Sequence, residues 1–285
     1  MSQQLSENAL QLRAAAHSAS QAVEALNSGQ QISSSDMVLA LKNAGYLSHE
    51  ITTTLKNYYN QSAQEAANEM YRKGYAGLTT AQNLKNQYGV SYRECAKLLK
   101  NAGFSGSSAG VGIYNTYNGM TYEGVGQALL DAGYSSGDVM AFMSSIRVPI
   151  NTAAEVFQKL GIPGKEVVKL LATAYNWVTQ EGIASAMRYG KYAINEIADG
   201  LKTFYNLTEE GVAYVLNKAQ FAAEEVARFF KDVYHKTAAE VADILKKTYN
   251  IGAEAAGKIL QGIGYAANQV ADALKSAFNW VADIY

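Results

Sequence analysis

The sequence predicts an all-α protein, an α-solenoid in which short tandem helical hairpins stack on one another. Three observations support this: a repeated sequence unit, apolar residues at helical spacing within the unit, and helix-capping residues at its ends. Of the 285 residues, 48% are hydrophobic and 17% are charged, a composition typical of a folded chain. About sixteen units are present, and self-similarity at a fixed period is the signature of a solenoid.

The repeat is clearest near the carboxyl end, where residues 236–250 contain one complete unit. An acidic or equivalent residue marks each start, at positions 50, 65, 79, 94, 109, 123, 138, 155, 166, 181, 196, 210, 225, 240, 254 and 269. These anchors are 14 or 15 residues apart, except that Glu155 is 17 residues after Asp138 and 11 before Glu166. Alternate units resemble each other more closely, so the structural period is one helix pair of about 29 residues.

Within each unit, apolar residues recur at i, i+4 and i+8, on one face of an α-helix. The clearest stripes are Ile51, Leu55 and Tyr59; Val167, Leu171 and Tyr175; Ile197, Leu201 and Tyr205; Val241, Leu245 and Tyr249; and Val270, Leu274 and Phe278. A helix of roughly ten residues does not persist alone in water, so each must pack on its neighbours. Most of the 20 tyrosines are therefore expected in the core.

Capping residues mark the ends of the units. Capping boxes are predicted for Ser62 with Glu65, Ser91 with Glu94, Thr152 with Glu155, and Thr237 with Glu240. Helix stops are predicted at Gly45, Asn60, Gly74, Gly89, Gly103, Gly133, Asn176, Asn206, Asn250 and Asn279, which can adopt a left-handed conformation. Apolar residues such as Trp177 follow several stops and can fold back on the preceding turn.

Three regions depart from the repeat. Residues 5–27 are expected to form one longer amphipathic helix that caps the array. Residues 105–123 form a degraded unit, with Ala109 at the anchor position. Pro149 and Pro163 flank the unit with irregular spacing, where we expect a kink or a seam between lobes. The predicted division is 1–35 (capping helix and polar linker), 36–148 (first repeat lobe), 149–163 (irregular unit) and 164–285 (second, more regular lobe).

The helix-pair period resembles that of tetratricopeptide, HEAT and armadillo arrays. The unit here is shorter than theirs, and their diagnostic residues are absent from the sequence. The resemblance therefore implies only the architectural class, an array of stacked helix pairs with an extended surface.

No combination of residues has the pattern of a catalytic, cofactor or metal site. Acidic residues at helix starts, and lysines such as Lys202 and Lys246 near helix ends, recur throughout, as expected if each stabilises its own helix. The three histidines share no short spacing, and Cys95 occupies a stripe position where a thiol is buried and inert. Residues 106–112 are glycine-rich but lack the ending of a phosphate loop, so a loosened helix or loop is expected. We expect neither an enzyme nor a cofactor.

Charge and hydropathy limit the partners. Lys and Arg total 24 against 25 Asp and Glu, and this balance argues against a nucleic-acid partner. The sequence shows neither a signal peptide nor a long apolar segment, which predicts a soluble protein that is cytoplasmic or exported without a cleaved signal. The single Cys95 excludes an internal disulfide, as is typical of a reducing compartment.

The leading hypothesis is a non-enzymatic interaction protein whose Tyr-rich surface binds a protein, peptide or glycan. Tyr114, Tyr117 and Tyr122 are the candidate contact residues, because they lie outside the core stripe and inside the degraded unit. The alternative is a membrane-active, toxin-like protein whose short amphipathic helices open onto a bilayer. At the carboxyl end, Trp280 and Ile284 are expected either to fold back over the last helices or to join subunits into a homo-oligomer.

Overall fold

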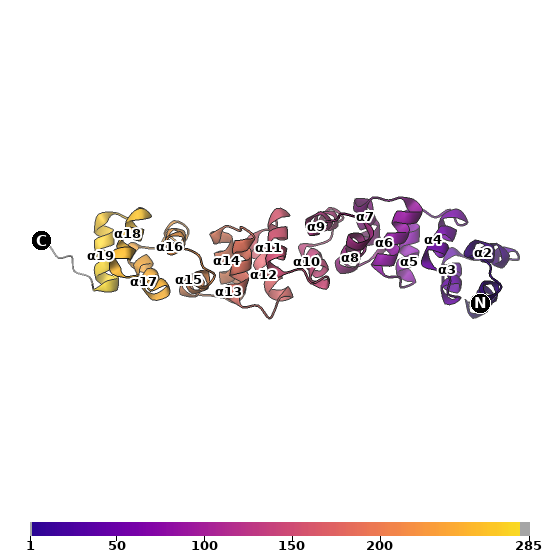
Figure 1. Ribbon diagram of the computed structural model, residues 1–285, viewed down its shortest axis with the longest axis horizontal. Coiled ribbons are helices and arrows are strands. Elements are labelled where there is room, and N and C mark those ends of the chain that lie inside the picture. Colours follow the sequence, from indigo (N-terminus) through magenta and orange to yellow (C-terminus); the bar gives the residue numbers. More distant parts are fainter. Residues whose placement is uncertain (1, 280–285) are drawn as a thin grey trace. The chain divides into compact units, whose positions relative to one another are not determined.

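A computed structural model describes residues 2–279. Every regular element in this range is a helix, and the range contains no strand (Figure 1). The helices are α1 (Ser2–Ala14), α2 (Ala19–Asn27), α3 (Ser34–Asn43), α4 (Ser48–Asn57), α5 (Ala63–Arg72), α6 (Gly77–Asn83), which continues as a π-helical turn η1 (Leu84–Tyr88), α7 (Tyr92–Ala102), α8 (Gly106–Thr116), α9 (Tyr122–Asp131), α10 (Ser136–Ser145), α11 (Ile150–Lys159), α12 (Gly164–Ala174), α13 (Gln180–Tyr189), α14 (Ile194–Tyr205), α15 (Glu209–Lys218), α16 (Ala223–Asp232), α17 (Ala238–Tyr249), α18 (Ala253–Gly262) and α19 (Ala267–Phe278). The predictions about Trp280 and Ile284 concern residues outside this described range.

The chain divides between Arg147 and Val148 into two compact units, here called unit 1 (α1–α10) and unit 2 (α11–α19). Within each unit, most helices pack against the next helix and against the helix two places later. In unit 1, α8 lies against both α6 and α10. In unit 2, α12 lies against α14, and α17 against α19. This neighbour packing confirms the predicted α-solenoid of helical hairpins.

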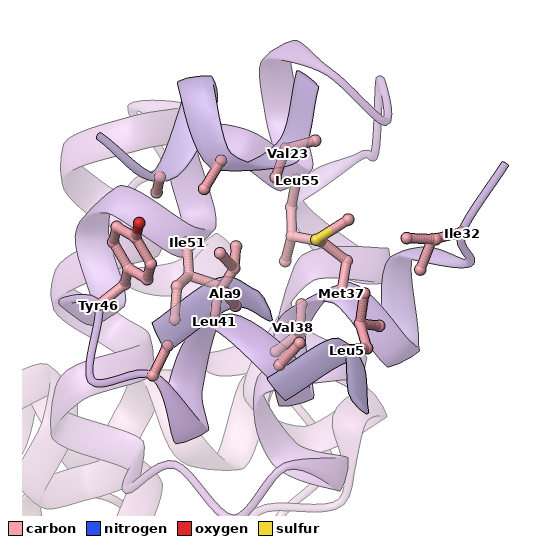
Figure 2. Packing of buried hydrophobic residues seen from close by; sticks show 14 of the residues in the cluster. Leu5, Ala9, Val23, Ile32, Met37, Val38, Leu41, Tyr46, Ile51 and Leu55 are labelled. Atoms are coloured by element: carbon pink, nitrogen blue, oxygen red, sulfur yellow. The ribbon is translucent and has the colours of Figure 1, made fainter. Parts of the chain in front are cut away.

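The predicted stripes form the core of each unit. Leu171, Leu201 and Leu245 are completely buried, and Cys95 is buried at the stripe position assigned to it. Figure 2 shows the cluster at the amino-terminal end of unit 1, where the labelled side chains from α1, α2, α3 and α4 point toward one another. The i, i+4, i+8 spacing therefore identified the packing face correctly.

All the predicted stops except Asn176 have a positive φ, as left-handed helix ends require. Asn176 instead lies in the turn after α12, whose C-cap is Tyr175 with a φ of −113°. Arg147, Lys191 and Gln220 also have positive φ, at positions where other repeats carry glycine. The sequence did not identify these three, because their residue types do not favour this conformation.

The prediction of a single helix over residues 5–27 is wrong. The segment contains two helices, α1 and α2, separated by Ala16 with a φ of 61°. Ser18 begins α2 in a capping box with Gln21, a signal that was present in the sequence. Because α1 packs on α3 and α2 packs on α4, this segment is a further helix pair of the same kind as those that follow.

The predicted capping box of Thr152 with Glu155 is also wrong. Helix α11 begins at Ile150 and α12 at Gly164, so each proline occupies the position just before a helix. Glu155 therefore lies in the middle of α11 instead of at its start, where it pairs with Lys159 at 2.9 Å. Proline is tolerated at a helix start because the fixed φ fits and its missing N–H is not needed there.

Residues 106–112 do not form a loop or a loosened helix. They belong to α8, whose N-cap is Ser105; the Ser105 hydroxyl accepts from the Ser108 N–H at 3.3 Å. A Cβ on Gly110 would lie 2.5 Å from the Phe142 ring of α10, and one on Gly112 would lie 2.7 Å from the Gly77 carbonyl oxygen of α6. The glycines therefore let α8 approach both neighbours closely, and the unit that looked degraded is tightly packed.

Candidate functional site

Tyrosines at helix ends tie each helix to the start of the helix before it. In eight cases the tyrosine hydroxyl donates to a backbone carbonyl just before the N-cap of the preceding helix. Seven of these bonds, at 2.6–3.2 Å, run from Tyr46 to His17, Tyr59 to Ile32, Tyr117 to Val90, Tyr134 to Phe104, Tyr175 to Val148, Tyr192 to Ile162, and Tyr249 to Phe221. The eighth runs from Tyr265 to Lys236. Burial raises the pKa of these hydroxyls, as for Tyr134 and Tyr192. Their recurrence marks them as structural.

A cation near the end of many helices ties that helix to the one two places later. Lys85 Nζ donates to the Thr116 carbonyl at 2.8 Å and lies 5.1 Å from the centre of the Tyr117 ring. The same pair of contacts joins Arg13 to Ala44 and Tyr46, Lys42 to Lys73 and Tyr75, Lys56 to Gln87 and Tyr88, Arg188 to Ala219 and Phe221, Lys231 to Ile263 and Tyr265, and Lys246 to Ala277 and Phe278. We call this pair of contacts the cation staple.

The staple corrects the role assigned to these lysines from the sequence. Lys246 lies at the end of α17 but donates to a carbonyl at the end of α19, at 2.6 Å. Lys202 of α14 lies 4.6 Å from the centre of the Tyr234 ring, which follows α16, and pairs with Glu209. The cations therefore stabilise a neighbouring helix end, in addition to any effect on their own.

The structure separates the three candidate tyrosines. Tyr117 is half-buried, with its hydroxyl on the Val90 carbonyl and its ring beneath Lys85. Tyr114 and Tyr122 are brought together: their half-buried rings stack with centres 5.4 Å apart. A hydrogen bond between them raises the pKa of Tyr114. Tyr117 is thus a structural link, and the three do not form one exposed contact surface.

The cation staple is interrupted in the middle of the chain. Apart from Arg13, each staple residue is the ninth of its helix, as Lys42 is in α3 and Lys246 in α17. In five successive helices, α8 to α12, this position is uncharged: Tyr114, Leu130, Ser144, Gln158 and Ala172. In unit 2, Ala172 is too short to reach the end of α14, the helix that a staple from α12 would cover.

Large apolar side chains are exposed at the carboxyl ends of alternate helices in unit 2. Trp177, after α12, is 75% exposed; Phe204, in the last turn of α14, is 41% exposed; and Val233, after α16, is 44% exposed. Because α14 packs against both α12 and α16, one repeat apart, these residues lie along one edge of the unit. We call Trp177, Phe204 and Val233 the carboxyl-edge row. The expectation that Trp177 folds back is therefore wrong: it meets the Tyr175 ring edge-on at 5.7 Å but remains in solvent.

A groove of about 520 Å³ lies beside Phe204, between α12 and α14. Its lining residues are Pro163, Lys165, Glu166, Lys169, Gly200, Thr203 and Phe204. The helices touch at Gly200, where a Cβ would lie 2.6 Å from Val168 Cγ2. Because Gly200 has no side chain, nothing from this position fills the space between α12 and α14, and the groove stays open to solvent. We call this feature the α12–α14 groove.

The remaining reactive groups are committed to structure. Burial raises the pKa of Cys95 to about 12, so the thiol stays protonated. Hydrogen bonds to Thr237 and Lys236 lower the pKa of Glu240 to about 2, as expected for a carboxylate in a capping box. Among residues 2–279, no cluster of three or more His, Cys, Asp or Glu side chains could hold a metal ion.

Comparison of the chain with known protein families and with curated proteins finds no match. Within the described range, no helix has both the length and the apolar character needed to cross a membrane. The carboxyl-edge row and the α12–α14 groove are therefore the features from which a function can be argued.

Proposed function

We propose that this protein is a non-enzymatic binding scaffold that holds a protein or peptide partner on the carboxyl-edge row of unit 2. The observation that carries the proposal is the exposure of Trp177, Phe204 and Val233 on successive alternate helices. Aromatic side chains are enriched in binding sites because they bury a large area with few rotatable bonds. An exposed indole beside two further apolar groups is an unfavourable arrangement unless a partner covers it.

The scaffold around the row supports this role. Tyr175 and Tyr192, at the ends of α12 and α13, are held by their hydroxyl bonds to Val148 and Ile162. Contact residues on helices held in this way lose little conformational freedom when a partner binds. Tyrosines thus support this surface by fixing helices of unit 2, and they are other residues than Tyr114, Tyr117 and Tyr122, which lie in unit 1.

The proposal is tested by selecting peptides from a phage-displayed library of random dodecamers against the full chain. We expect selected peptides to bind a Trp177→Ala/Phe204→Ala/Val233→Ala variant at least about tenfold more weakly, a loss of about 1.4 kcal/mol. The matched control replaces three apolar residues of unit 1 with similar exposure, Leu10, Leu47 and Tyr58, by alanine. Failure to enrich any peptide, or equal binding by both variants, would contradict the proposal.

Membrane activity is a second candidate, favoured by the exposed indole of Trp177, since tryptophan partitions to membrane interfaces. The measurement is dye leakage from vesicles of phosphatidylcholine and phosphatidylglycerol, with Trp177 fluorescence followed in a Trp280→Phe background. The binding-scaffold proposal predicts neither leakage nor a blue shift. Leakage together with a blue shift would favour the membrane-active function instead.

A further inference from the structure

The floor of the α12–α14 groove is apolar. Pro163 and Phe204 supply apolar surface on its two sides, and Gly200 leaves the floor without a side chain. A volume of about 520 Å³ is within the range of sites that enclose small ligands, roughly 300–1,000 Å³. This space accepts one or two large apolar side chains, and it is continuous with the carboxyl-edge row through Phe204.

The rim of the groove carries unused positive charge. Lys165 and Lys169 lie four residues apart on α12, so they share one helix face, and both are exposed. Neither lysine makes an ion pair within residues 2–279. Other exposed lysines do: Lys247 pairs with Asp243 and Lys258 with Glu254, each four residues earlier.

The one acidic residue on the lining does not cancel this charge. Lys165 and Lys169 contribute two positive charges and Glu166 one negative charge, which leaves a net charge of +1 (2 − 1). Glu166 also acts on Tyr192, whose pKa is raised first by burial and then by nearby carboxylates that include Glu166. The groove thus combines an apolar floor with a cationic rim.

We propose that the α12–α14 groove binds an acidic, apolar peptide segment. One large apolar side chain of the segment enters between Pro163 and Phe204, and carboxylates beside it pair with Lys165 and Lys169. This inference rests on the proposed function and adds the chemistry of the partner to it. A peptide fits better than a compact small molecule because the groove is open and leads directly onto the apolar row.

The test uses a displayed library of decapeptides with a fixed central Leu-Phe pair and flanking positions randomised among Glu, Lys and Ser. The wild-type full chain is expected to enrich Glu over Lys by at least about tenfold at the flanks. A Lys165→Glu/Lys169→Glu variant is expected to reverse the preference. The matched control, Lys97→Glu/Lys275→Glu, makes the same charge change at exposed lysines outside the groove and should keep the preference for Glu.

A third variant tests the groove itself. Thr203 is exposed on the lining, so Thr203→Trp should fill the space without disturbing the core, and binding of the enriched peptides should fall by about tenfold or more. Circular dichroism melting of each variant confirms that it is folded. Equal recovery of Glu and Lys by the wild type, or full peptide binding by the Thr203→Trp variant, would overturn the inference.

Failure of this inference can be told apart from failure of the proposed function. If random dodecamers require Trp177 and Val233 but show no acidic bias and do not respond to Lys165→Glu/Lys169→Glu, the row binds partners and the groove does not. If the enriched peptides bind the Trp177→Ala/Val233→Ala variant normally but require Thr203 and the two lysines, the groove is the site and the row is not.

Discussion

Helices two places apart are joined in two different ways in this protein. In unit 1, α8 meets α10 through glycine, and a Cβ on Gly110 would lie 2.5 Å from the Phe142 ring. In unit 2, α17 meets α19 with a cation staple, in which Lys246 reaches the Ala277 carbonyl at 2.6 Å and the Phe278 ring at 5.4 Å. The glycine contact leaves no room for a side chain, whereas the staple is made by a long side chain at the surface.

The difference between glycine contacts and stapled contacts bears on function at the contact between α12 and α14. The contact between α12 and α14 uses Gly200 but has Ala172 at the staple position, so the end of α14 has no cation from α12 over it. Phe204 at that end is exposed, and the α12–α14 groove lies beside it. At α12–α14, a glycine contact without a staple is thus accompanied by an exposed apolar helix end.

Alkaline pH should weaken both kinds of region together, and we expect this to be the largest effect. Burial raises the pKa of Tyr88 and of Tyr234 to about 12, above the ordinary value of 10.0. Because these pKa values are higher in the folded state, their contribution to stability is complete below pH 10 and is lost as the pH rises toward 12. Thermal melting followed by circular dichroism should show a falling Tm above about pH 10. A constant Tm through that window would contradict the buried-tyrosine account.

Truncation of the core of unit 2 sets the scale for the smaller effects. Leu171→Ala, Leu201→Ala and Leu245→Ala should each lower the free energy of unfolding by about 2–5 kcal/mol, because each leucine is completely buried. Urea denaturation gives the values. A cost below about 1 kcal/mol at any of them would mean that the stripe does not pack as described.

Adding one methyl group should be costly at a glycine contact. Gly110→Ala should destabilise the protein by about 1–3 kcal/mol, because the new Cβ would overlap the Phe142 ring. Gly137, also in a helix, has only the Ser135 hydroxyl near it, at 3.5 Å from a Cβ, so Gly137→Ala should stabilise by about 0.5–1 kcal/mol. Urea denaturation measures both, and equal effects would show that the glycines of α8 are not a packing device.

Removing a cation staple should have a smaller effect. Lys246→Ala should cost about 0.5–1.5 kcal/mol, since it removes a hydrogen bond and a cation–ring contact at a partly solvated site. A surface lysine without such contacts usually changes stability by less than about 0.5 kcal/mol when it is replaced. Lys275→Ala is the control and should stay below that figure. Identical values for the two lysines would remove the stabilising role of the staple.

Periodicity explains why so much of the fold was predictable. The burial of Leu201 and Leu245 and the left-handed ends at Asn206 and Asn250 follow from local spacing and capping, which a single sequence displays directly. The close approach of α8 to its neighbours was not predictable, because it depends on which helices are adjacent. Composition alone made Gly110 look like a sign of a loose segment.

The candidate site was missed for a related reason. Tyr117 looked like a surface residue because its partner, the Val90 carbonyl, is 27 residues away. Its recurrence at the same place in other repeats was the available signal that its role is structural. Trp177 gave no such signal, because the residue after the stop is apolar in other units too, as at Val90, Leu207 and Trp280. Its exposure depends on what the neighbouring helices place over it, which a single sequence does not display.

The central claim is that the missing staple at Ala172 leaves the end of α14 open for a partner. Its most direct test is the affinity of the selected peptides for an Ala172→Lys variant, with Thr173→Lys, at an exposed neighbouring position, as the control. We predict that the new lysine reaches the end of α14, raises the Tm and weakens peptide binding by about tenfold, whereas Thr173→Lys leaves binding unchanged. An Ala172→Lys protein with a raised Tm and unchanged peptide affinity would contradict the claim.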